Sequence, residues 1–307
     1  WASLARNKKC VTLDLRKDEG RAVLRQLLDK ADVLVENFRP GTMEKWGLGP
    51  EQVKATNPGL IYARISGYGQ TGPYSERPGY GIICEAVSGL RHLTGDPDRP
   101  PARVATALTD YITGLYAAFG ATMALLARVR TGRGQVVDAA LAECAMSFIE
   151  PHVPAYDKLK EVANRTGSGL VGSVPNNLYV TGDGRYIHIQ AAQQSVFRRF
   201  APAIGRPELW EDPRFNTIIA RGQNQQALDD IVTEWTTAHA LEELERTLLA
   251  ADVPATRINT VADIFVDPHF RARGMLVEAP SSEMGSVTLA GPVPKLSATP
   301  ARIRHAG

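Results

Sequence analysis

The first part of the chain alternates between short apolar runs and amphipathic segments. Apolar residues recur with period two over residues 10–15, and residues 33–37 and 60–66 are nearly continuous apolar runs, so we predict a strand in each. Residues 18–31 place apolar side chains at i, i+3 and i+4, which predicts an amphipathic helix, and residues 51–56 predict a helical turn or two. This order of strands and helices is typical of a parallel sheet with right-handed crossovers.

A glycine-rich stretch follows the third predicted strand. Residues 67–81 contain five glycines and two prolines, so we expect an irregular loop at the carboxyl end of that strand. Ligands of open α/β sheets bind at such strand ends. Further helices are predicted over residues 82–93, 110–127 and 142–157, and a further strand over residues 136–141.

The pattern changes near residues 167–175, where the strand–helix rhythm gives way to a mostly helical module. We therefore predict an α/β protein with a large, open, Rossmann-like parallel-sheet domain over residues 1–175 and a smaller α+β domain over residues 176–275. Residues 276–307 are expected to return toward the large domain. The second region is expected to hold strands at 185–190, 252–258, 275–279 and 287–289 and helices at 195–204, 225–236, 241–250 and 261–265.

Composition narrows the class of protein. The chain has 307 residues, of which 44% are hydrophobic and 22% charged, and its net charge of +2 gives no support for a nucleic-acid or acidic-membrane partner. We find no charge-free apolar run of about 18 residues, so no membrane span is expected. Three scattered cysteines are typical of reduced thiols in a cytoplasmic protein. The six histidines show no metal-ligand spacing, so no metal site is predicted.

Asp110 is the most informative single residue. It is a lone carboxylate in an uncharged stretch, at the start of a long apolar segment. Thr109 and Asp110 are both residue types that cap helices, and the positive end of a helix favours an ionised carboxylate. The local sequence is consistent with a helix cap and with a nucleophile. His92 and His188 are candidate general bases by residue type alone.

Several common motifs are absent or ambiguous. The chain has no Walker A sequence, no dinucleotide fingerprint and no nucleophile elbow. The run Gly167-Ser-Gly-Leu-Val-Gly172 is consistent with a ligand-covering loop and equally with a hinge between domains.

The order of the longer motifs is more specific. The chain closely resembles the class III CoA-transferases, which include formyl-CoA transferase and carnitine CoA-transferase and are related to the 2-methylacyl-CoA racemases. The resemblance extends from Asn7 to Ser297, and because that family has further segments at both ends, we expect this chain to be cut from a longer protein. The motifs that carry it are Asn7-Lys-Lys-Cys-Val-Thr-Leu-Asp-Leu15, Ala31-Asp-Val-Leu-Val-Glu-Asn-Phe-Arg-Pro-Gly41, Asn57-Pro-Gly-Leu-Ile-Tyr-Ala-Arg-Ile-Ser-Gly-Tyr-Gly-Gln-Thr-Gly-Pro73, Thr106-Ala-Leu-Thr-Asp-Tyr-Ile-Thr-Gly114 and Thr131-Gly-Arg-Gly-Gln-Val-Val-Asp138.

The resemblance implies an activity and a set of site residues. Asp110 matches the family's nucleophile, which carries CoA between two acids through a mixed anhydride and an aspartyl-CoA thioester. The acyl-CoA and the carboxylic acid are then substrates, CoA is a cosubstrate rather than a tightly bound cofactor, and the chain is expected to form an interlocked homodimer. Gly167, Gly169 and Gly172 resemble the family's mobile glycine loop over the active site. The residues implied to border CoA are Leu13, Asp14, Leu15, Arg16, Asn37, Phe38, Lys45 and Tyr80.

Two alternatives stay open at the level of sequence. Racemases of this superfamily use a His beside the position of Tyr80, together with an Asp where Asp110 stands, and the absence of that His favours a transferase. A CoA-binding protein without turnover is the other alternative. The segments 79–90 and 173–177 resemble transferases of dicarboxylates such as succinate, malate and glutarate more than the oxalate enzyme.

Overall fold

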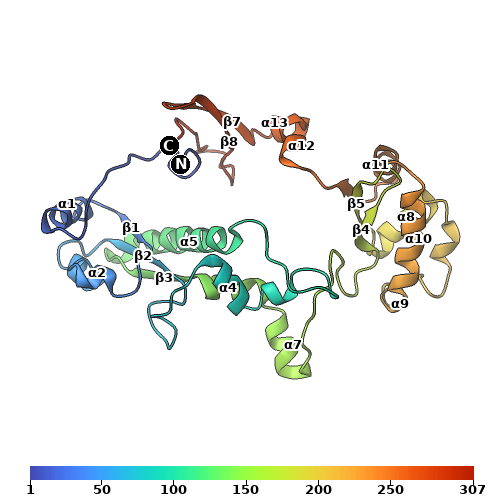
Figure 1. The fold of residues 1–307 in the computed structure, drawn as a ribbon, viewed down its shortest axis with the longest axis horizontal. Helices are drawn as coiled ribbons and strands as arrows, with labels where there is room; N and C mark the ends of the chain where they lie inside the picture. Colours follow the sequence, from blue (N-terminus) through green and yellow to red (C-terminus); the bar gives the residue numbers. More distant parts are fainter. The chain divides into compact units, whose positions relative to one another are not determined.

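The computed structural model describes residues 1–307, which form two compact units (Figure 1). One unit comprises residues 13–169, and the other joins residues 1–12 to residues 170–307. The three-part domain division expected from the sequence, with residues 276–307 returning to the large domain, stays a prediction.

A three-stranded parallel sheet forms the centre of the unit of residues 13–169. Its strands are β1 (Val33–Glu36), β2 (Ile61–Ser66) and β3 (Val136–Ala140), in that spatial order. Both strand pairs are parallel. The predicted α/β class with a parallel sheet is therefore confirmed.

Helices cover both faces of this sheet. Successive residues of a strand point to opposite faces, so neighbouring residues of β2 pack against different helices. Ile61 packs with Ala121 and Ala124 of α5 on one face. The next residue, Tyr62, packs on the other face in a cluster with residues of α1, α2 and α3, and its hydroxyl donates to the carbonyl of Leu48 at 2.8 Å. Burial on both faces explains why β2 reads as a continuous apolar run.

The remaining elements of this unit follow the predicted order. They are α1 (Asp18–Leu28), α2 (Thr42–Lys45), α3 (Pro50–Lys54), α4 (Gly81–Val87), η1 (Arg91–Leu93), α5 (Leu108–Thr131), α6 (Leu141–Met146), η2 (Ser147–Ile149) and α7 (His152–Leu159).

Three predictions in the first half of the chain were wrong in detail. Residues 10–15 form no strand, because no neighbouring strand pairs with them despite their alternating pattern. The helix expected over residues 82–93 ends at Val87, since Gly89 adopts φ +89° and stops the helical path. The helix expected over residues 142–157 is interrupted before Pro151, which has no backbone N–H and crowds the preceding turn.

Helix α5 is longer than predicted. It begins at Leu108 and ends at Thr131, with Gly132 in the left-handed conformation after it. Its length and composition would suffice to cross a membrane, although the sequence predicted no such span. Two of its buried residues, Ala121 and Ala124, pack against Ile61 of β2, which is the packing of a sheet-covering helix.

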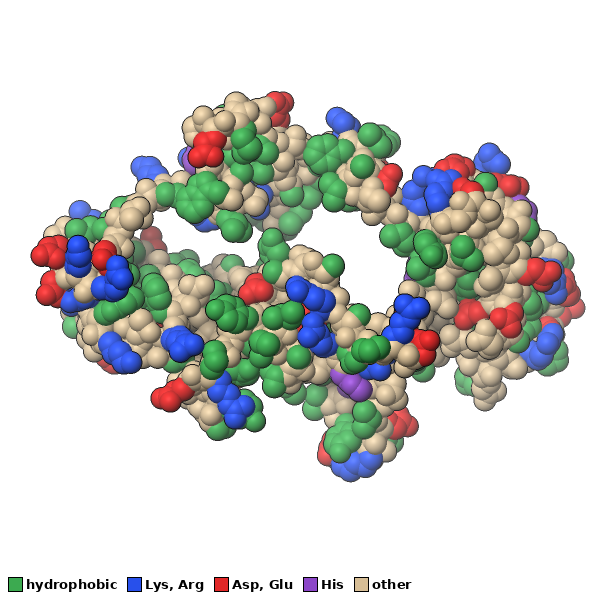
Figure 2. All heavy atoms as spheres, viewed as in Figure 1, with side chains coloured by type: hydrophobic (Ala, Val, Ile, Leu, Met, Phe, Trp, Pro, Cys, Tyr) green, Lys and Arg blue, Asp and Glu red, His purple; other side chains and the backbone are tan.

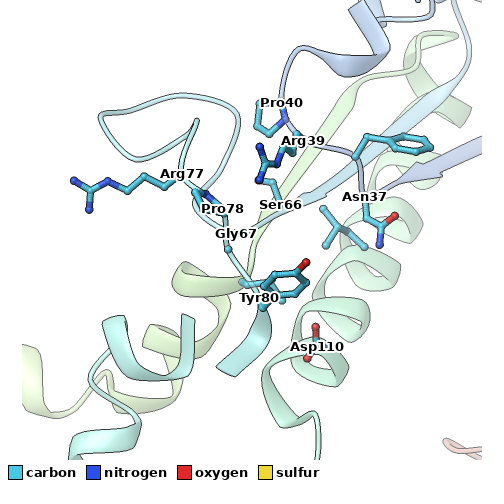
Figure 3. Close-up of a pocket in the computed structure, with 13 residues that line it drawn as sticks. Asn37, Arg39, Pro40, Ser66, Gly67, Arg77, Pro78, Tyr80 and Asp110 are labelled. Atoms are coloured by element: carbon cyan, nitrogen blue, oxygen red, sulfur yellow. The ribbon is translucent and has the colours of Figure 1, made fainter. Parts of the chain in front are cut away.

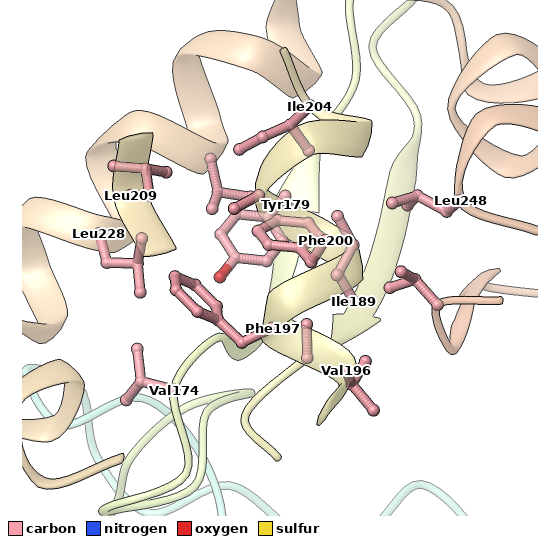
Figure 4. Close-up of a cluster of buried hydrophobic side chains, with 14 of the residues drawn as sticks. Val174, Tyr179, Ile189, Val196, Phe197, Phe200, Ile204, Leu209, Leu228 and Leu248 are labelled. Atoms are coloured by element: carbon pink, nitrogen blue, oxygen red, sulfur yellow. The ribbon is translucent and has the colours of Figure 1, made fainter. Parts of the chain in front are cut away.

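The second unit contains an antiparallel sheet, in the order β4–β5–β6, with helices packed against it, and a separate hairpin of β7 and β8. Its main core joins the aromatic rings of Phe197 and Phe200 to Tyr179 and to aliphatic side chains of the sheet and helices (Figure 4). The elements are β4 (Asn176–Val180), β5 (Tyr186–Gln190), α8 (Gln194–Ala203), η3 (Pro207–Trp210), α9 (Ile218–Gln223), α10 (Gln225–Thr237), α11 (Leu241–Ala250), β6 (Ala255–Arg257), α12 (Val261–Val266), α13 (Pro268–Ala272), β7 (Leu276–Ser281) and β8 (Gly285–Ala290).

A buried cation holds several loops of this unit together. Arg221 is fully buried, and its guanidinium donates to the carbonyls of Val174, Ala192 and Phe215 and to the side chain of Gln194. No carboxylate pairs with Arg221, and burial lowers its pKa to about 10, so it is charged at neutral pH. Its role is therefore to satisfy carbonyl groups that would otherwise be buried without donors.

The two ends of the chain meet within this unit. The Asn7 side chain donates to the carbonyl of Arg302 at 2.7 Å and accepts from the Arg304 N–H at 2.7 Å. Arg6 donates to the carbonyl of Ala290 at 2.9 Å. These bonds explain why residues 1–12 belong with the C-terminal part of the chain.

Candidate active site

A cavity of about 390 Å³ opens at the carboxyl ends of the parallel strands. The segment after β1, the end of β2, the glycine-rich loop, the start of α5 and the residue after β3 all contribute to it (Figure 3). This is the edge where ligands of open α/β sheets bind. We call it the larger cavity, and its lining residues are Asn37, Phe38, Arg39, Pro40, Ile65, Ser66, Gly67, Arg77, Pro78, Gly79, Tyr80, Asp110 and Leu141.

A buried ion cluster fixes the segment after β1. The Arg64 guanidinium on β2 contacts Glu36 at 2.8 Å and Glu44 at 2.7 Å. The other oxygen of Glu36 accepts the backbone N–H of Phe38 at 2.8 Å, which holds the segment of Asn37 and Phe38 in place. Burial opposes the ionised form of Glu44, but its hydrogen bonds with Arg64 prevail and hold its pKa below the ordinary value.

Asp110 is the third residue of α5, on its first turn. The residue before the helix is Ala107, and no side chain caps this end, so the interpretation of Asp110 or Thr109 as a cap was wrong. The Asp110 carboxylate is exposed and has no ion pair or hydrogen bond with the protein. It is thus an anion at the mouth of a cavity with no structural partner.

The carboxylate packs directly against the start of α4. A methyl group added at Gly81 would lie 2.1 Å from Oδ2 of Asp110 and 2.8 Å from its Cγ. Only a residue without a side chain leaves room for Asp110 in this position. The close approach also sets the carboxylate beside the positive end of α4 as well as that of its own helix.

Cys84, one turn further along α4, is not a competing nucleophile. Its thiol is buried and donates to the carbonyl of Gly67 at 3.3 Å. Burial, together with the negative charge of Asp110, raises the pKa of Cys84 to about 11. The thiol is therefore neutral at physiological pH and unreactive as a thiolate.

A second cavity, of about 230 Å³, lies against the same carboxylate. Tyr80 and Asp110 line both cavities, and Arg103 is the one cationic side chain in the lining of this smaller cavity. We call it the smaller cavity, and its lining residues are Tyr80, Gly81, Ile82, Glu85, Arg103, Thr106, Ala107, Leu108, Thr109 and Asp110.

The structure brings together four of the residues singled out from the sequence. Asn37, Phe38, Tyr80 and Asp110 line the larger cavity, and the side chain of Arg77 extends away from Tyr80 and Asp110 (Figure 3). The other candidates do not line it, and their roles toward CoA stay predictions.

Those other candidates lie as follows. Arg16 pairs with Asp14 at 2.9 Å next to Leu13 and Leu15, and Lys45 is an exposed residue at the end of α2. Gly167 donates its N–H to the carbonyl of Gly95, and Gly169 donates to that of Thr166. Gly172 adopts φ +72°.

The candidate general bases lie in other surroundings. His188 on β5 contacts the side chain of Asn176 at 3.0 Å, and the carbonyl of His92 accepts from Arg165. Neither histidine lines a cavity with Asp110. The structure contains no group of three or more His, Cys, Asp or Glu side chains suited to a metal ion.

Sequence reasoning missed two residues that line the smaller cavity with Asp110. Gly81 is the last residue of the predicted glycine-rich loop, and no role was predicted for Arg103. A glycine immediately before an apolar helical pattern was a signal for a close approach at Gly81. Nothing in the sequence indicated that Arg103 and Asp110 share a cavity.

Comparisons with known proteins identify the family of the chain. The model of CoA-transferase family III matches residues 1–307. The chain is 44% identical to succinyl-CoA–D-citramalate CoA-transferase of Chloroflexus aurantiacus, covering all of this chain and 76% of that protein. It is 40% identical to the alpha subunit of succinyl-CoA–L-malate CoA-transferase of Chloroflexus aurantiacus, and the match covers 100% of this chain and 72% of that protein. It is 34% identical to succinyl-CoA:glutarate CoA-transferase of Mus musculus, and the match covers 97% of this chain and 68% of that protein.

Solved structures show the same fold. A CaiB/BaiF family protein from Brucella suis has a TM-score of 0.87 at 36% identity, with 99% of this chain and 79% of that chain covered. Rv3272 of M. tuberculosis has a TM-score of 0.87 at 29% identity, with 98% of this chain and 81% of that chain covered. The chain therefore belongs to CoA-transferase family III and is a CoA-transferase.

Proposed function

We propose that this chain transfers CoA from an acyl-CoA to a short dicarboxylic acid and that Asp110 is the nucleophile. The observation that carries the proposal is the position of Asp110, an unpartnered carboxylate that lines two cavities at once. Relatives named for transfer from succinyl-CoA to citramalate, malate and glutarate support a dicarboxylate acceptor.

The first half of the reaction loads CoA onto Asp110. An Asp110 oxygen attacks the thioester carbonyl of the donor, the C–S bond breaks, and CoA leaves as a thiolate. The thiolate then attacks Cγ of Asp110 in the resulting mixed anhydride, and the donor acid leaves as a carboxylate. Asp110 is now held as a thioester of CoA, which is covalent catalysis in two steps.

The second half repeats these steps in reverse with a new acid. A carboxylate oxygen of the acceptor attacks Cγ of Asp110, and the CoA thiolate leaves again. The thiolate attacks the acceptor's carbonyl carbon, which releases the new acyl-CoA and the free Asp110 carboxylate. No water is consumed, so the free energy of the thioester is conserved.

This cycle explains why a carboxylate serves as the nucleophile. An ester of Ser would be too stable to return the acyl group to CoA, whereas an anhydride or thioester of Asp stays activated. The intermediates are sensitive to hydrolysis, so water must be kept away. We assign that task to the glycine segment of Gly167, Gly169 and Gly172, as the family resemblance implies.

The CoA contacts belong to the same proposal. Asn37 and Phe38, fixed by the ion cluster of Glu36 and Arg64, would border the pantetheine arm in the larger cavity. Arg16 and Lys45 carry the positive charge suited to CoA's phosphates.

A racemase is less well supported. Racemisation at an α-carbon needs two acid–base groups on opposite sides of that carbon. The side chain that faces the cavities beside Asp110 is the phenol of Tyr80, whereas imidazole is the usual base at neutral pH.

The decisive experiment compares wild type with Asp110→Asn in a panel of CoA donors and carboxylic acids, followed by mass spectrometry. The amide keeps the shape and loses the nucleophile, so transfer should fall by roughly 1,000-fold or more while CoA still binds. Glu76→Gln is the matched control, since it removes an exposed carboxylate that lines neither cavity. Undiminished transfer by Asp110→Asn would contradict the assignment.

We also propose that the protein acts as a cytoplasmic homodimer. Helix α5 exposes an apolar stripe, Tyr111, Leu115, Phe119 and Met123, on the side away from its buried alanines, and hydrophobic side chains reach the surface of this unit (Figure 2). The cytoplasmic location is supported by the three cysteines, which are free thiols as is usual in a reducing compartment. Light scattering after gel filtration tests the assembly. Wild type should be a dimer, and Phe119→Glu should dissociate into monomers. A monomeric wild type, or a wild type that pairs only with a different subunit, would contradict the homodimer.

A further inference from the structure

The smaller cavity beside Asp110 has the chemistry of a site for an anion. Arg103 lies on the segment that leads into α5 and lines this cavity. It forms no ion pair, and its one hydrogen bond is from Nε to the carbonyl of the next residue, Val104, at 3.3 Å. A guanidinium has five N–H donors, so most of the donors of Arg103 are free.

Neither of the two carboxylates in the cavity wall pairs with Arg103. Glu85 is almost fully buried, and the cation nearest to it is Arg91, at 3.5 Å. Asp110, the other carboxylate in the wall, has no ion pair. The charge of Arg103 is therefore available to a bound molecule rather than committed to the fold.

A second polar group in the wall also has no partner. Thr109 is buried, and its hydroxyl has no hydrogen-bond partner in the protein. Buried polar atoms in native proteins normally have a hydrogen-bond partner, so this hydroxyl is a polar group in the wall that the fold itself does not use. Thr109 precedes Asp110 directly, which places the unsatisfied group next to the reacting carboxylate.

The cavity is of a size for a small acid. Its volume of about 230 Å³ is below the roughly 300–1,000 Å³ typical of sites for drug-sized ligands. The larger cavity, on the other side of Tyr80 and Asp110, offers more room for the arm of CoA. One carboxylate thus has a separate cavity for each of two reactants.

We propose that the smaller cavity binds the carboxylic acid substrate and that Arg103 pairs with the second carboxylate of a dicarboxylic acid. The first carboxylate then faces Asp110 for attack, while the second is held by the guanidinium, which matches carboxylate geometry with two parallel hydrogen bonds. Arg103 is by this reasoning the residue that selects dicarboxylates over monocarboxylates. The inference rests on the proposed function.

The test compares succinate with butyrate, which has the same number of carbons but a single carboxylate, as acceptors from one fixed acyl-CoA donor. The measured quantity is the ratio of kcat/KM for the two acids, because effects on the donor half of the reaction cancel in that ratio. Arg103→Met should reduce the ratio by roughly 10- to 100-fold, the worth of a hydrogen-bonded charge pair. Arg103→Lys should restore part of the preference.

Arg99→Met is the matched control. Arg99 lies on the same loop, is 75% exposed in its side chain and lines neither cavity, so the ratio should not change. Circular dichroism establishes that each variant is folded. An unchanged ratio in folded Arg103→Met would overturn this inference alone, whereas a wild type that transfers CoA to neither acid nor to other acids would overturn the proposed function and this inference with it.

Discussion

Replacing Gly81 by Ala separates the geometry of the site from the stability of the fold. Gly81 is the first residue of α4, and its backbone does not adopt the left-handed conformation that would require glycine. Alanine is a better helix former than glycine by up to about 1 kcal/mol, so the fold should tolerate the change. The three atoms nearest to the new methyl group all belong to the end of one side chain, the Asp110 carboxylate.

The size of the effect follows from the distances. The added carbon would lie 2.1 Å from Oδ2, whereas carbon and oxygen in contact are about 3.3 Å apart, so the carboxylate must retreat by about 1.2 Å. A displacement of about 1 Å in a reacting group can cost roughly 100-fold in rate, or about 2.7 kcal/mol of activation free energy. We therefore expect kcat to fall by roughly 100-fold in Gly81→Ala.

The assay is the initial rate of CoA transfer at saturating substrates, together with a thermal unfolding curve. Gly114→Ala is the control, because Gly114 is on α5 one turn after Asp110 and a methyl group there meets nothing within 4 Å. It should keep wild-type kcat. A Gly81→Ala variant with wild-type kcat would refute the reasoning, because the reacting group then does not need the position that Asp110 holds.

Other consequences concern stability and reactivity. Arg64→Met should lower the free energy of unfolding by about 3–5 kcal/mol in chemical denaturation, because it leaves a buried carboxylate unpaired; a loss below 1 kcal/mol would contradict the ion cluster. Because the pKa of Glu44 is lowered in the fold, its stabilisation is present above the unfolded-state pKa of 4.5 and is lost as pH falls through the folded-state value. The stability gap between wild type and Glu44→Gln should therefore shrink below pH 4.5, and a gap that widens in acid would contradict it. Iodoacetamide at pH 8 should alkylate exposed Cys10 and spare Cys84, and Cys84→Ala should keep its transfer activity; rapid alkylation of Cys84 in the folded protein would refute its assignment as a neutral thiol. Arg221→Met should destabilise the fold by about 3 kcal/mol or more in thermal unfolding, since several buried carbonyls lose their donor, and an unchanged unfolding temperature would show that water replaces it.

The sequence predicted the parallel sheet because its central strand, β2, is buried on both faces. A run such as Ile61–Ser66 has few alternatives once helices flank it, and the antiparallel pair β7 and β8 was similarly readable. Residues 10–15 show the limit of this reasoning. An alternating pattern fits a strand, but a strand also needs a neighbour, and the neighbour is a property of the whole fold.

The candidate site was only partly predictable, for a related reason. Asp110 stood out because it is a lone charge in an apolar stretch, and the family resemblance supplied its role. The contact between Gly81 and Asp110 joins residues 29 positions apart, and the cavity shared by Arg103 and Asp110 depends on how the start of α5 packs against α4. Such juxtapositions leave no periodic signal in the sequence.

Peptide mass spectrometry can detect the covalent bond between CoA and Asp110 that the proposed cycle requires. The protein is incubated with an acyl-CoA, quenched in acid and digested, and the peptide containing Asp110 is examined. This peptide should gain the mass of CoA less one water, because a thioester replaces one carboxyl oxygen of Asp110. Hydroxylamine should convert the adduct to a hydroxamate, and acceptor acid added before the quench should discharge it. An adduct on a different residue, or transfer at full rate with no adduct on the Asp110 peptide, would contradict covalent transfer through Asp110.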